Sequence, residues 1–347
     1  MLFGLRVDVD TLWGLERGVR NLLDLFDEFG IKATFFIPFG PDRTGRTIKR
    51  IICEKGFFQR LVRIHSRMRS SECGVRNYPL GIRIPHSAFH GTLLPSPLMG
   101  ANHPLILKEI EKRGHEVAIH GFDHYHWRDD LLKIGEREIE QELGKATNGY
   151  QKVFKRTPHA TAAPGWRCTG KSLLLQERYS FQYASDTRGF SPFFPLIPIL
   201  NLKSQISNNY QLPITNYQSL NTLQLPVTLP TLDELIPLGK TKTLFEIPLT
   251  PFNKGGSKGD FTNHQSPITN YQLYCAHAEV EGGPMISLFR DFLQKVLEVG
   301  AWRHGATPLR DIAKRFLENQ DEIPRCRIEW GKVPGRTMEV AVQMKNE

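Results

Sequence analysis

The 347-residue chain lacks any apolar run long enough to cross a membrane. No stretch approaches the roughly 18 consecutive apolar residues of a spanning helix, and the most apolar loop, FSPFFPLIPIL, is short and interrupted by proline. The first residues, MLFGLRVDVD, also lack the order of basic, apolar and small residues that marks a secretory signal peptide. The sequence therefore predicts neither a transmembrane helix nor an export signal.

Cysteine is scarce as well. The cysteines are odd in number and show no paired spacing, which is typical of reduced thiols in a cytosolic protein rather than of a disulfide framework. We therefore expect a cytoplasmic protein. The five cysteines are Cys53, Cys73, Cys168, Cys275 and Cys326.

Acidic residues are outnumbered, 36 against 45 lysines and arginines, and the net charge is +9. This balance favours anionic partners such as nucleic acid, anionic lipid or a phosphorylated substrate. Basic residues are dense from Arg43 to Arg69, where Glu54 is the one acid and apolar side chains are interleaved. Two interpretations stay open for this segment: a basic helix packed on the fold, or a surface for an anionic membrane. No recognised nucleic-acid module is present, so we expect no nucleic-acid partner.

Short apolar segments alternate with helical patterns along most of the chain. Helices are expected over 16–29, 105–114, roughly 129–147, 169–178 and 286–300. The alternation is typical of parallel βα units in an open sheet or a barrel. Polar residues gather where the expected strands end, which is where such folds place their active sites. About seven strands are expected, within 2–10, 33–40, 115–120, 160–167, 181–186, 223–231 and 272–282.

Two stretches and the tail fall outside this alternation. Residues near 201–222 and 253–272 are rich in Asn and Gln and share the hexapeptide PITNYQ, which we interpret as insertions in surface loops. We expect one domain over 1–318. Residues 319–347 then form a C-terminal extension, whose segment RIEWGKVPGRTMEVAVQ predicts a β-hairpin turning at Pro334-Gly335.

A pair of acids closes the first expected strand, in RVDVD. Asp8 and Asp10 are two residues apart, so both carboxylates point to the same side of the strand. Unpaired buried charge is costly, and such a pair indicates either a cation, a chemical task or a solvated strand end.

Histidines are dense in HEVAIHGFDHYHW. His120 and His124 are four apart, and a helical turn beginning there would place both imidazoles on one face. His115 and His126 are not expected to be ligands. One carboxylate with two histidines is a common set for Zn²⁺, Mn²⁺, Co²⁺ or Fe²⁺. The second aspartate of the pair could then act as a general base.

Two further residues suit catalysis. His277, in CAHAEVEG, ends another expected strand and could be a general acid. Arg167, in APGWR, could hold an aspartate in its ionised form.

Taken together, these motifs resemble the NodB-homology polysaccharide deacetylases. Within that family the chain is most similar to the branch of deformylases that act on a lipid-linked formamido sugar. The resemblance covers most of residues 4–312. The matching pieces, in the family's order, are GLRVDVDT, GPDRTGR, HEVAIHGFDHYHW, AAPGWR, YASDTRG, LPVTLPTLDE and HAEVEG.

The resemblance implies a distorted, seven-stranded (β/α) barrel and one divalent metal ion, Zn²⁺, Mn²⁺ or Co²⁺. It assigns Asp8 as the catalytic base and gives the metal to Asp10, His120 and His124. Two departures from the wider family are visible here: Val9 separates the two acids, and Gly121 follows the first histidine.

The remaining roles are carried over in the same way. The resemblance makes His277 the acid, supported by Asp186, and makes Arg167 the support of the base. Arginine precedes the proline in the family's third motif, whereas Arg167 follows Pro164 here. Substrate contacts are expected from Arg43, Arg46, Arg188 and Trp166, with a backbone N–H near Trp166 stabilising the oxyanion.

The function implied is hydrolysis of the N-formyl group of 4-formamido-4-deoxy-L-arabinose carried on undecaprenyl phosphate, in lipid A modification. A cytoplasmic enzyme acting on such a lipid is expected to lie peripherally on the anionic inner face of the membrane. Two alternatives remain at this point. One is a deacetylase of another N-acylated sugar, and the other is a non-catalytic sugar-lipid binding protein that keeps the fold.

Overall fold

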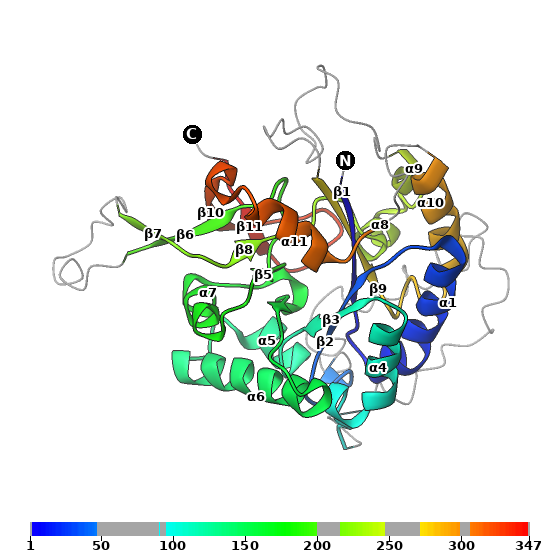
Figure 1. Cartoon of the computed structure of the whole chain (residues 1–347), viewed down its shortest axis with the longest axis horizontal. Coiled ribbons are helices and arrows are strands. Elements are labelled where there is room, and N and C mark those ends of the chain that lie inside the picture. Colours follow the sequence, from blue (N-terminus) through cyan, green and yellow to red (C-terminus); the bar gives the residue numbers. More distant parts are fainter. Residues whose placement is uncertain are drawn as a thin grey trace.

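The computed structural model describes residues 2–46, 90, 95–199, 216–246, 271–298 and 306–345. Its centre is a sheet of seven parallel strands in the order β8-β5-β4-β3-β2-β1-β9 (Figure 1). The expectation of about seven parallel strands is thereby confirmed. The strands are β1 (Leu2–Asp8), β2 (Thr34–Ile37), β3 (Glu116–Ile119), β4 (Ala160–Thr161), β5 (Tyr183–Ala184), β8 (Leu223–Gln224) and β9 (Tyr271–His277).

The two edges of this sheet meet. The backbone N–H groups of Thr228 and Leu229, just after β8, donate to the carbonyl oxygen of Leu273 on β9 at 3.1 and 3.2 Å. The hydroxyl of Tyr271 donates to the carbonyl of Pro226 at 3.0 Å. These bonds close the curled sheet irregularly, so the fold is the distorted barrel that the sequence predicted.

Strand β1 shows how the sequence divides between the two faces of the sheet. Leu5 and Val7 are buried in the apolar layer under the outer helices, whereas Arg6 and Asp8 point into the barrel. The strand reads as a nearly continuous apolar run because both of its faces are covered. Its register places Asp8 beside His277 of β9.

Helices cover the outside of the barrel. The first expected helix is present as a π-turn η1 (Gly14–Gly18) continued by α1 (Val19–Phe29), and Gly30 ends it with φ 63°. In Figure 1, α1, α4 and α10 lie along one side of the sheet. The bounds of these and further helices are α4 (Pro104–Lys112), α7 (Gly170–Gln176), α8 (Leu232–Leu238), α9 (Thr243–Glu246), α10 (Ile286–Glu298) and α11 (Leu309–Leu317).

The helix expected near 129–147 is placed differently. The chain forms a short helix, α5 (His124–Asp130), and then a longer one, α6 (Glu136–Phe154). The Asp123 side chain caps α5 by accepting from the N–H of His126, and Gly135 stands at the N-cap of α6. Two helix starts therefore replace the single predicted one. Single 3₁₀ turns are η4 (Gly100–Asn102), η5 (Pro164–Trp166), η6 (Glu177–Tyr179) and η8 (Gln320–Glu322).

A second, four-stranded sheet packs beside the barrel in the order β11-β10-β6-β7. Its strands are β6 (Phe194–Pro198), β7 (Tyr217–Ser219), β10 (Arg325–Gly331) and β11 (Val340–Gln343). β10 and β11 pair antiparallel, whereas β10 and β6 run parallel. The C-terminal segment is thus joined to strands from the middle of the chain, and β6 and β7 were not expected from the sequence.

Several features noted in the sequence fall outside the described residues. These are most of the basic segment beyond Arg46, the larger parts of the two Asn/Gln-rich stretches, and Cys53 and Cys73. The described cysteines Cys168, Cys275 and Cys326 are buried free thiols. Within the described ranges, no helix combines the length and apolarity of a membrane span.

Candidate active site and metal centre

Three predicted metal ligands converge at the carboxyl end of the barrel strands. Asp10 follows β1, His120 follows β3, and His124 is the first residue of α5. His124 Nε2 lies 3.2 Å and His120 Nε2 lies 3.6 Å from Asp10 Oδ1. Together they form one of two clusters of candidate metal ligands among the described residues.

A tight turn rather than a helix face brings the two imidazoles together. His120 ends the pairing of β3 by donating its N–H to the carbonyl of Ile37, and Gly121 then adopts φ 71°. A side chain in that left-handed conformation is disfavoured, so glycine suits the position. The two imidazoles do lie together, as their spacing of four residues predicted, but the turn before α5 brings them together and not a shared helix face.

The side chain of His120 is set up to act as a ligand through Nε2. Its Nδ1 lies 2.8 Å from the carbonyl oxygen of Ala162, and a carbonyl can only accept, so Nδ1 carries the proton. The lone pair is then on Nε2, which faces Asp10. His120 Nε2 and Asp10 Oδ1 are buried and form no hydrogen bond with the described residues.

This donor set fits a small divalent cation. Ligand atoms placed about 2.0–2.1 Å from Zn²⁺ at tetrahedral angles are separated from one another by about 3.3 Å. The distances of 3.2 and 3.6 Å between the imidazole nitrogens and Asp10 Oδ1 are close to that value. The charge distribution agrees with it. Burial would raise the pKa of Asp10, but His124 and then His120 outweigh burial and hold it well below its usual range. Burial lowers the pKa of His124, which favours the neutral imidazole that a metal requires.

Asp8 lies beside this cluster, 3.6 Å from His120 Nε2, and is held by Arg6. The guanidinium donates from Nε to Asp8 Oδ1 at 2.6 Å and from Nη2 to Oδ2 at 2.7 Å. Burial would raise the pKa of Asp8, but Arg6 and His120 outweigh it and lower the pKa. Asp8 is therefore ionised and fixed in direction. Arg6 was not predicted as a site residue, although its position two residues before Asp8 places both on one face of β1.

His277 ends β9 and lies beside Asp8 of the neighbouring strand β1. Its Nδ1 is 3.5 Å from Asp233 Oδ1, and its backbone N–H donates to Glu281 at 2.8 Å. Burial lowers the pKa of His277, but Asp233, Asp10 and Asp8 outweigh burial and raise it to about 9. The imidazole is thus protonated at neutral pH. Asp233 belongs to the motif LPVTLPTLDE, which was noted in the sequence without a role for this residue.

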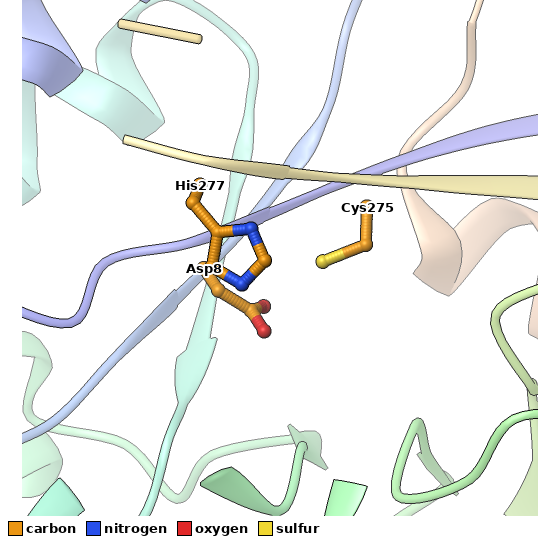
Figure 2. A group of neighbouring side chains, drawn as sticks. All are labelled: Asp8, Cys275 and His277. Carbon is orange, nitrogen blue, oxygen red and sulfur yellow. The ribbon is translucent and has the colours of Figure 1, made fainter. Parts of the chain in front are cut away.

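Figure 2 shows Asp8, Cys275 and His277 pointing toward one another from β1 and β9. Their ligand atoms also lie within 4.8 Å of one another. Both oxygens of Asp8 already accept from Arg6, however, and burial raises the pKa of the Cys275 thiol well above its usual range. A protonated thiol and an occupied carboxylate do not make a cation site. Cys275 is instead a buried thiol beside Asp8 and His277.

Glu279 anchors the loop that carries Asp10. A single oxygen, Oε1, accepts from the N–H of Asp10 at 3.0 Å, the N–H of Thr11 at 2.8 Å and the Thr11 hydroxyl at 2.8 Å. Burial, and then the charge of Asp10, raises the pKa of Glu279 to about 8. Glu279 was not predicted as a site residue either, although it lies two positions after His277.

The structure does not bring Arg167 and Asp186 to the groups they were expected to support. Arg167 Nη1 donates to the carbonyl of Glu339 at 3.0 Å, and its guanidinium lies over the ring of Trp330. Asp186 accepts from the N–H of Ala163 at 2.7 Å and from Gln224 at 3.0 Å. Asp186 thereby orders the turn whose preceding carbonyl holds His120. Arg6 and Asp233 stand where the support of the base and of the acid was expected.

The expected substrate contacts are placed around the same end of the barrel. Arg43 pairs with Asp123 at 2.8 Å and Arg46 with Asp130 at 3.2 Å, so both basic side chains border the helix that carries His124. Their contact with substrate stays a prediction.

Trp166 and Arg188 are buried next to each other, with the guanidinium 5.2 Å from the ring centroid. Arg188 also contacts Glu234 at 3.3 Å. A backbone N–H near Trp166 was expected at the oxyanion; that of Trp166 itself donates to the carbonyl of Ala163 at 3.1 Å. The indole Nε1 of Trp166 is buried and forms no hydrogen bond with the described residues, so it is the free donor of this residue.

Comparison with known proteins places this site in a family. Residues 86–184 match the polysaccharide deacetylase family model. The probable 4-deoxy-4-formamido-L-arabinose-phosphoundecaprenol deformylase ArnD of Shewanella sediminis (strain HAW-EB3) is 31% identical over 304 residues, which are 85% of this chain and 81% of that protein. The protein of the same name from Wigglesworthia glossinidia brevipalpis is 30% identical over 337 residues, 96% of this chain and 99% of that one.

The chain belongs to the ArnD deformylase family. As a member of that family it is a hydrolase of a carbon–nitrogen amide bond, and the interpretation as a non-catalytic binding protein is set aside. A solved Mycobacterium smegmatis structure of the polysaccharide deacetylase type aligns with a TM-score of 0.52 at 15% identity, over 93% of this chain and 92% of that one. At this identity the likeness supports the fold alone.

Proposed function

We propose that this protein removes the N-formyl group from 4-formamido-4-deoxy-L-arabinose linked to undecaprenyl phosphate, a step of lipid A modification, and releases formate. The observation that carries the proposal is the meeting of three functions at one end of the barrel, in a chain that matches ArnD proteins over most of its length. These are a metal-ligand trio, an ionised carboxylate and a protonated imidazole.

Asp10, His120 and His124 would hold one divalent ion, Zn²⁺, Mn²⁺ or Co²⁺. When bound, such an ion supplies Lewis-acid polarisation of the formyl carbonyl. Around it, Glu279 holds the backbone of Asp10, and the carbonyl of Ala162 orients His120. The free indole N–H of Trp166 is a candidate donor to the oxyanion.

Asp8 is the proposed base. It takes a proton from a water molecule as the water oxygen forms a bond to the formyl carbon. The two hydrogen bonds from Arg6 keep the Asp8 carboxylate ionised and aimed into the barrel. Arg6 therefore fixes the orientation of the Asp8 carboxylate and also keeps it charged.

His277 is the proposed acid. It gives its proton to the sugar nitrogen while the carbon–nitrogen bond breaks, so the products are formate and a free amine. The pKa of about 9 keeps the imidazole protonated before this step. Asp233, 3.5 Å from Nδ1, stabilises the charged ring.

The substrate also sets where the enzyme works. Transferring a polyprenyl chain out of the bilayer costs about 0.8 kcal/mol for each CH₂ group. The enzyme therefore has to approach the lipid, and we propose a peripheral position on the anionic cytoplasmic face of the inner membrane. The net charge of +9 favours this partner.

Mass spectrometry of the lipid-linked formamido sugar incubated with enzyme tests the proposal. The expected product has lost one CO unit, and formate appears in equal amount. Matched incubations use the acetamido form of the same sugar lipid. If acetate is released from the acetamido compound and no formate is released from the formamido compound, the protein is a deacetylase and not a deformylase.

A further inference from the structure

The turn between β10 and β11 places an arginine from the C-terminal segment next to the active site. Gly335 adopts φ 86°, and a Cβ at that position would collide with the carbonyl oxygen of Glu234. The close approach of the two backbones therefore requires glycine. The N–H of Arg336 donates to the carbonyl of Val333 at 3.1 Å and completes the turn.

The guanidinium of Arg336 has three partners. Nη2 donates to Asp233 Oδ2 at 2.8 Å, and Nε donates to Glu234 Oε1 at 2.8 Å. The guanidinium carbon lies 4.0 Å from the centroid of the Trp166 ring. The side chain is only 16% exposed, so little of its charge is available to solvent.

Two of these partners flank the proposed acid. Asp233 Oδ1, the oxygen not bound by Arg336, is the one that lies 3.5 Å from His277 Nδ1. The ring of Trp166 meets the imidazole edge-on, with centroids 6.3 Å apart. Arg336 thus touches both the carboxylate and the aromatic ring that border His277.

We propose that Arg336 is a positioning residue for His277: it holds Asp233 and Trp166 against the imidazole and so orients the acid for protonation of the leaving amine. The inference rests on the proposed function, in which His277 is that acid. It makes the C-terminal hairpin a part of the active site, although the hairpin supplies no group that reacts.

The physical reason lies in the neighbouring carboxylates. Asp233 and Glu234 are adjacent in the chain and both are turned toward Arg336. Without that cation the two acids would repel each other, and Asp233 would keep only the Thr231 hydroxyl, which donates to the oxygen that faces His277, and would lose the bond that holds its other oxygen. A misdirected imidazolium transfers its proton poorly, because proton transfer requires hydrogen-bond reach and alignment.

The dependence on the leaving group distinguishes this role from a merely structural one. An amine leaves only when it is protonated, whereas the phenolate of an activated aryl formate ester leaves without a proton. Arg336→Met should lower kcat for the lipid-linked formamido sugar by at least about tenfold, part of the roughly 10²- to 10⁴-fold that a positioned acid contributes. Its kcat for the aryl ester should stay within about twofold, and KM for the sugar lipid should change little.

Arg336→Lys is the second variant, because it keeps the charge but cannot serve two carboxylates from a planar group. It should recover part of the lost kcat on the amide. If the Met variant does not fold, the Lys variant alone decides by the same comparison of the two substrates. Arg325→Gln is the matched control: Arg325 lies on the same hairpin, is exposed and donates to Ser219, so both rates should stay at the wild-type level.

His277→Ala tests the assignment of the acid separately from the role of Arg336. If His277→Ala slows the amide selectively while the Arg336 variants slow amide and ester equally, Arg336 does not position the acid and this inference is overturned. If His277→Ala itself slows both substrates equally, the assignment of the acid fails, and the proposed mechanism has to be revised first.

Discussion

Arg6 and Asp8 bury opposite charges two residues apart on β1, with two hydrogen bonds between them. Arg6 also donates to Ser185 and lies against the rings of Phe36 and Trp166. Such a pair is costly to break, because the remaining charge stays buried without a partner; a loss of about 3–5 kcal/mol is typical. The ionisation of Asp8 and the stability of the barrel therefore both depend on the contact between Arg6 and Asp8.

Exchange of single arginines tests which one supports the base. Arg6→Lys should lower kcat by roughly tenfold or more, since an ammonium group cannot grip both oxygens of Asp8. Arg167→Lys should leave kcat close to wild type, because Arg167 faces Glu339 and Trp330 instead. Steady-state deformylation, with metal content measured on the same samples, checks both variants. The opposite order of effects would return the role to Arg167.

The pH profile reports on His277. An acid can donate only while it is protonated, so activity is retained below its pKa and lost above it. We expect kcat/KM to fall above about pH 9, the pKa of His277. In Asp233→Asn the fall should begin at lower pH, because Asp233 makes the largest contribution to raising that pKa. If kcat/KM falls at the same pH in Asp233→Asn as in the wild type, Asp233 does not raise the pKa of the catalytic acid.

For single residues, sequence spacing was enough to predict which acids meet. Asp8 ends β1 and Asp10 follows it, and both lie 3.6 Å from His120 Nε2, on the shared side that their spacing predicted. The supporting residues were harder to predict because their partners come from distant strands. Asp233 lies 44 positions before His277, and only closure of the barrel brings their side chains together.

At the scale of elements, the turn between β3 and α5 determines whether a metal can be held. Gly121→Ala should destabilise the fold by roughly 1–2 kcal/mol, because alanine is strained at φ 71°. It should also weaken metal binding by about tenfold, since His120 and His124 lose their relative orientation. Gly135→Ala is the control: a Cβ there meets nothing within 4 Å and φ is −84°, so only the modest cost of alanine at the N-cap of α6, up to about 1 kcal/mol, is expected, and metal binding should not change.

Thermal unfolding and competition with a metal chelator measure the two effects. Unchanged metal affinity in Gly121→Ala would mean that the loop tolerates a different path and does not set the ligand geometry.

Which elements could be predicted follows from their burial. β1 and β9 are mostly apolar strands that are buried along almost their whole length, and both were predicted. β6 and β7 belong to a sheet that only partly faces the core, and β7 has one exposed residue between two half-buried ones, so alternation gave no clear signal. The start of α6 was misplaced because a cap at Asp123 and a glycine at 135 divide what reads as one helix.

At the scale of the whole molecule, charge bears on partner choice. The net charge of +9 and the basic segment 43–69 predict reversible binding to anionic lipid, with each basic residue near the surface contributing roughly 1 kcal/mol. Co-sedimentation with liposomes should require anionic lipid and should weaken as salt rises. Replacing Arg60, Arg63 and Arg67 by glutamine should weaken it further. Binding that depends neither on lipid charge nor on these replacements would show that the segment has no role at the membrane.

We expect deformylation to require one divalent ion, held by Asp10, His120 and His124. Formate release from the lipid-linked formamido sugar, measured while Zn²⁺, Mn²⁺ or Co²⁺ is titrated into metal-free enzyme, tests this requirement. Activity should rise to a plateau at one equivalent of metal, and the double variant His120→Ala/His124→Ala should stay inactive at that ratio. Full activity in the metal-free enzyme, or an unchanged titration in the double variant, would contradict the claim.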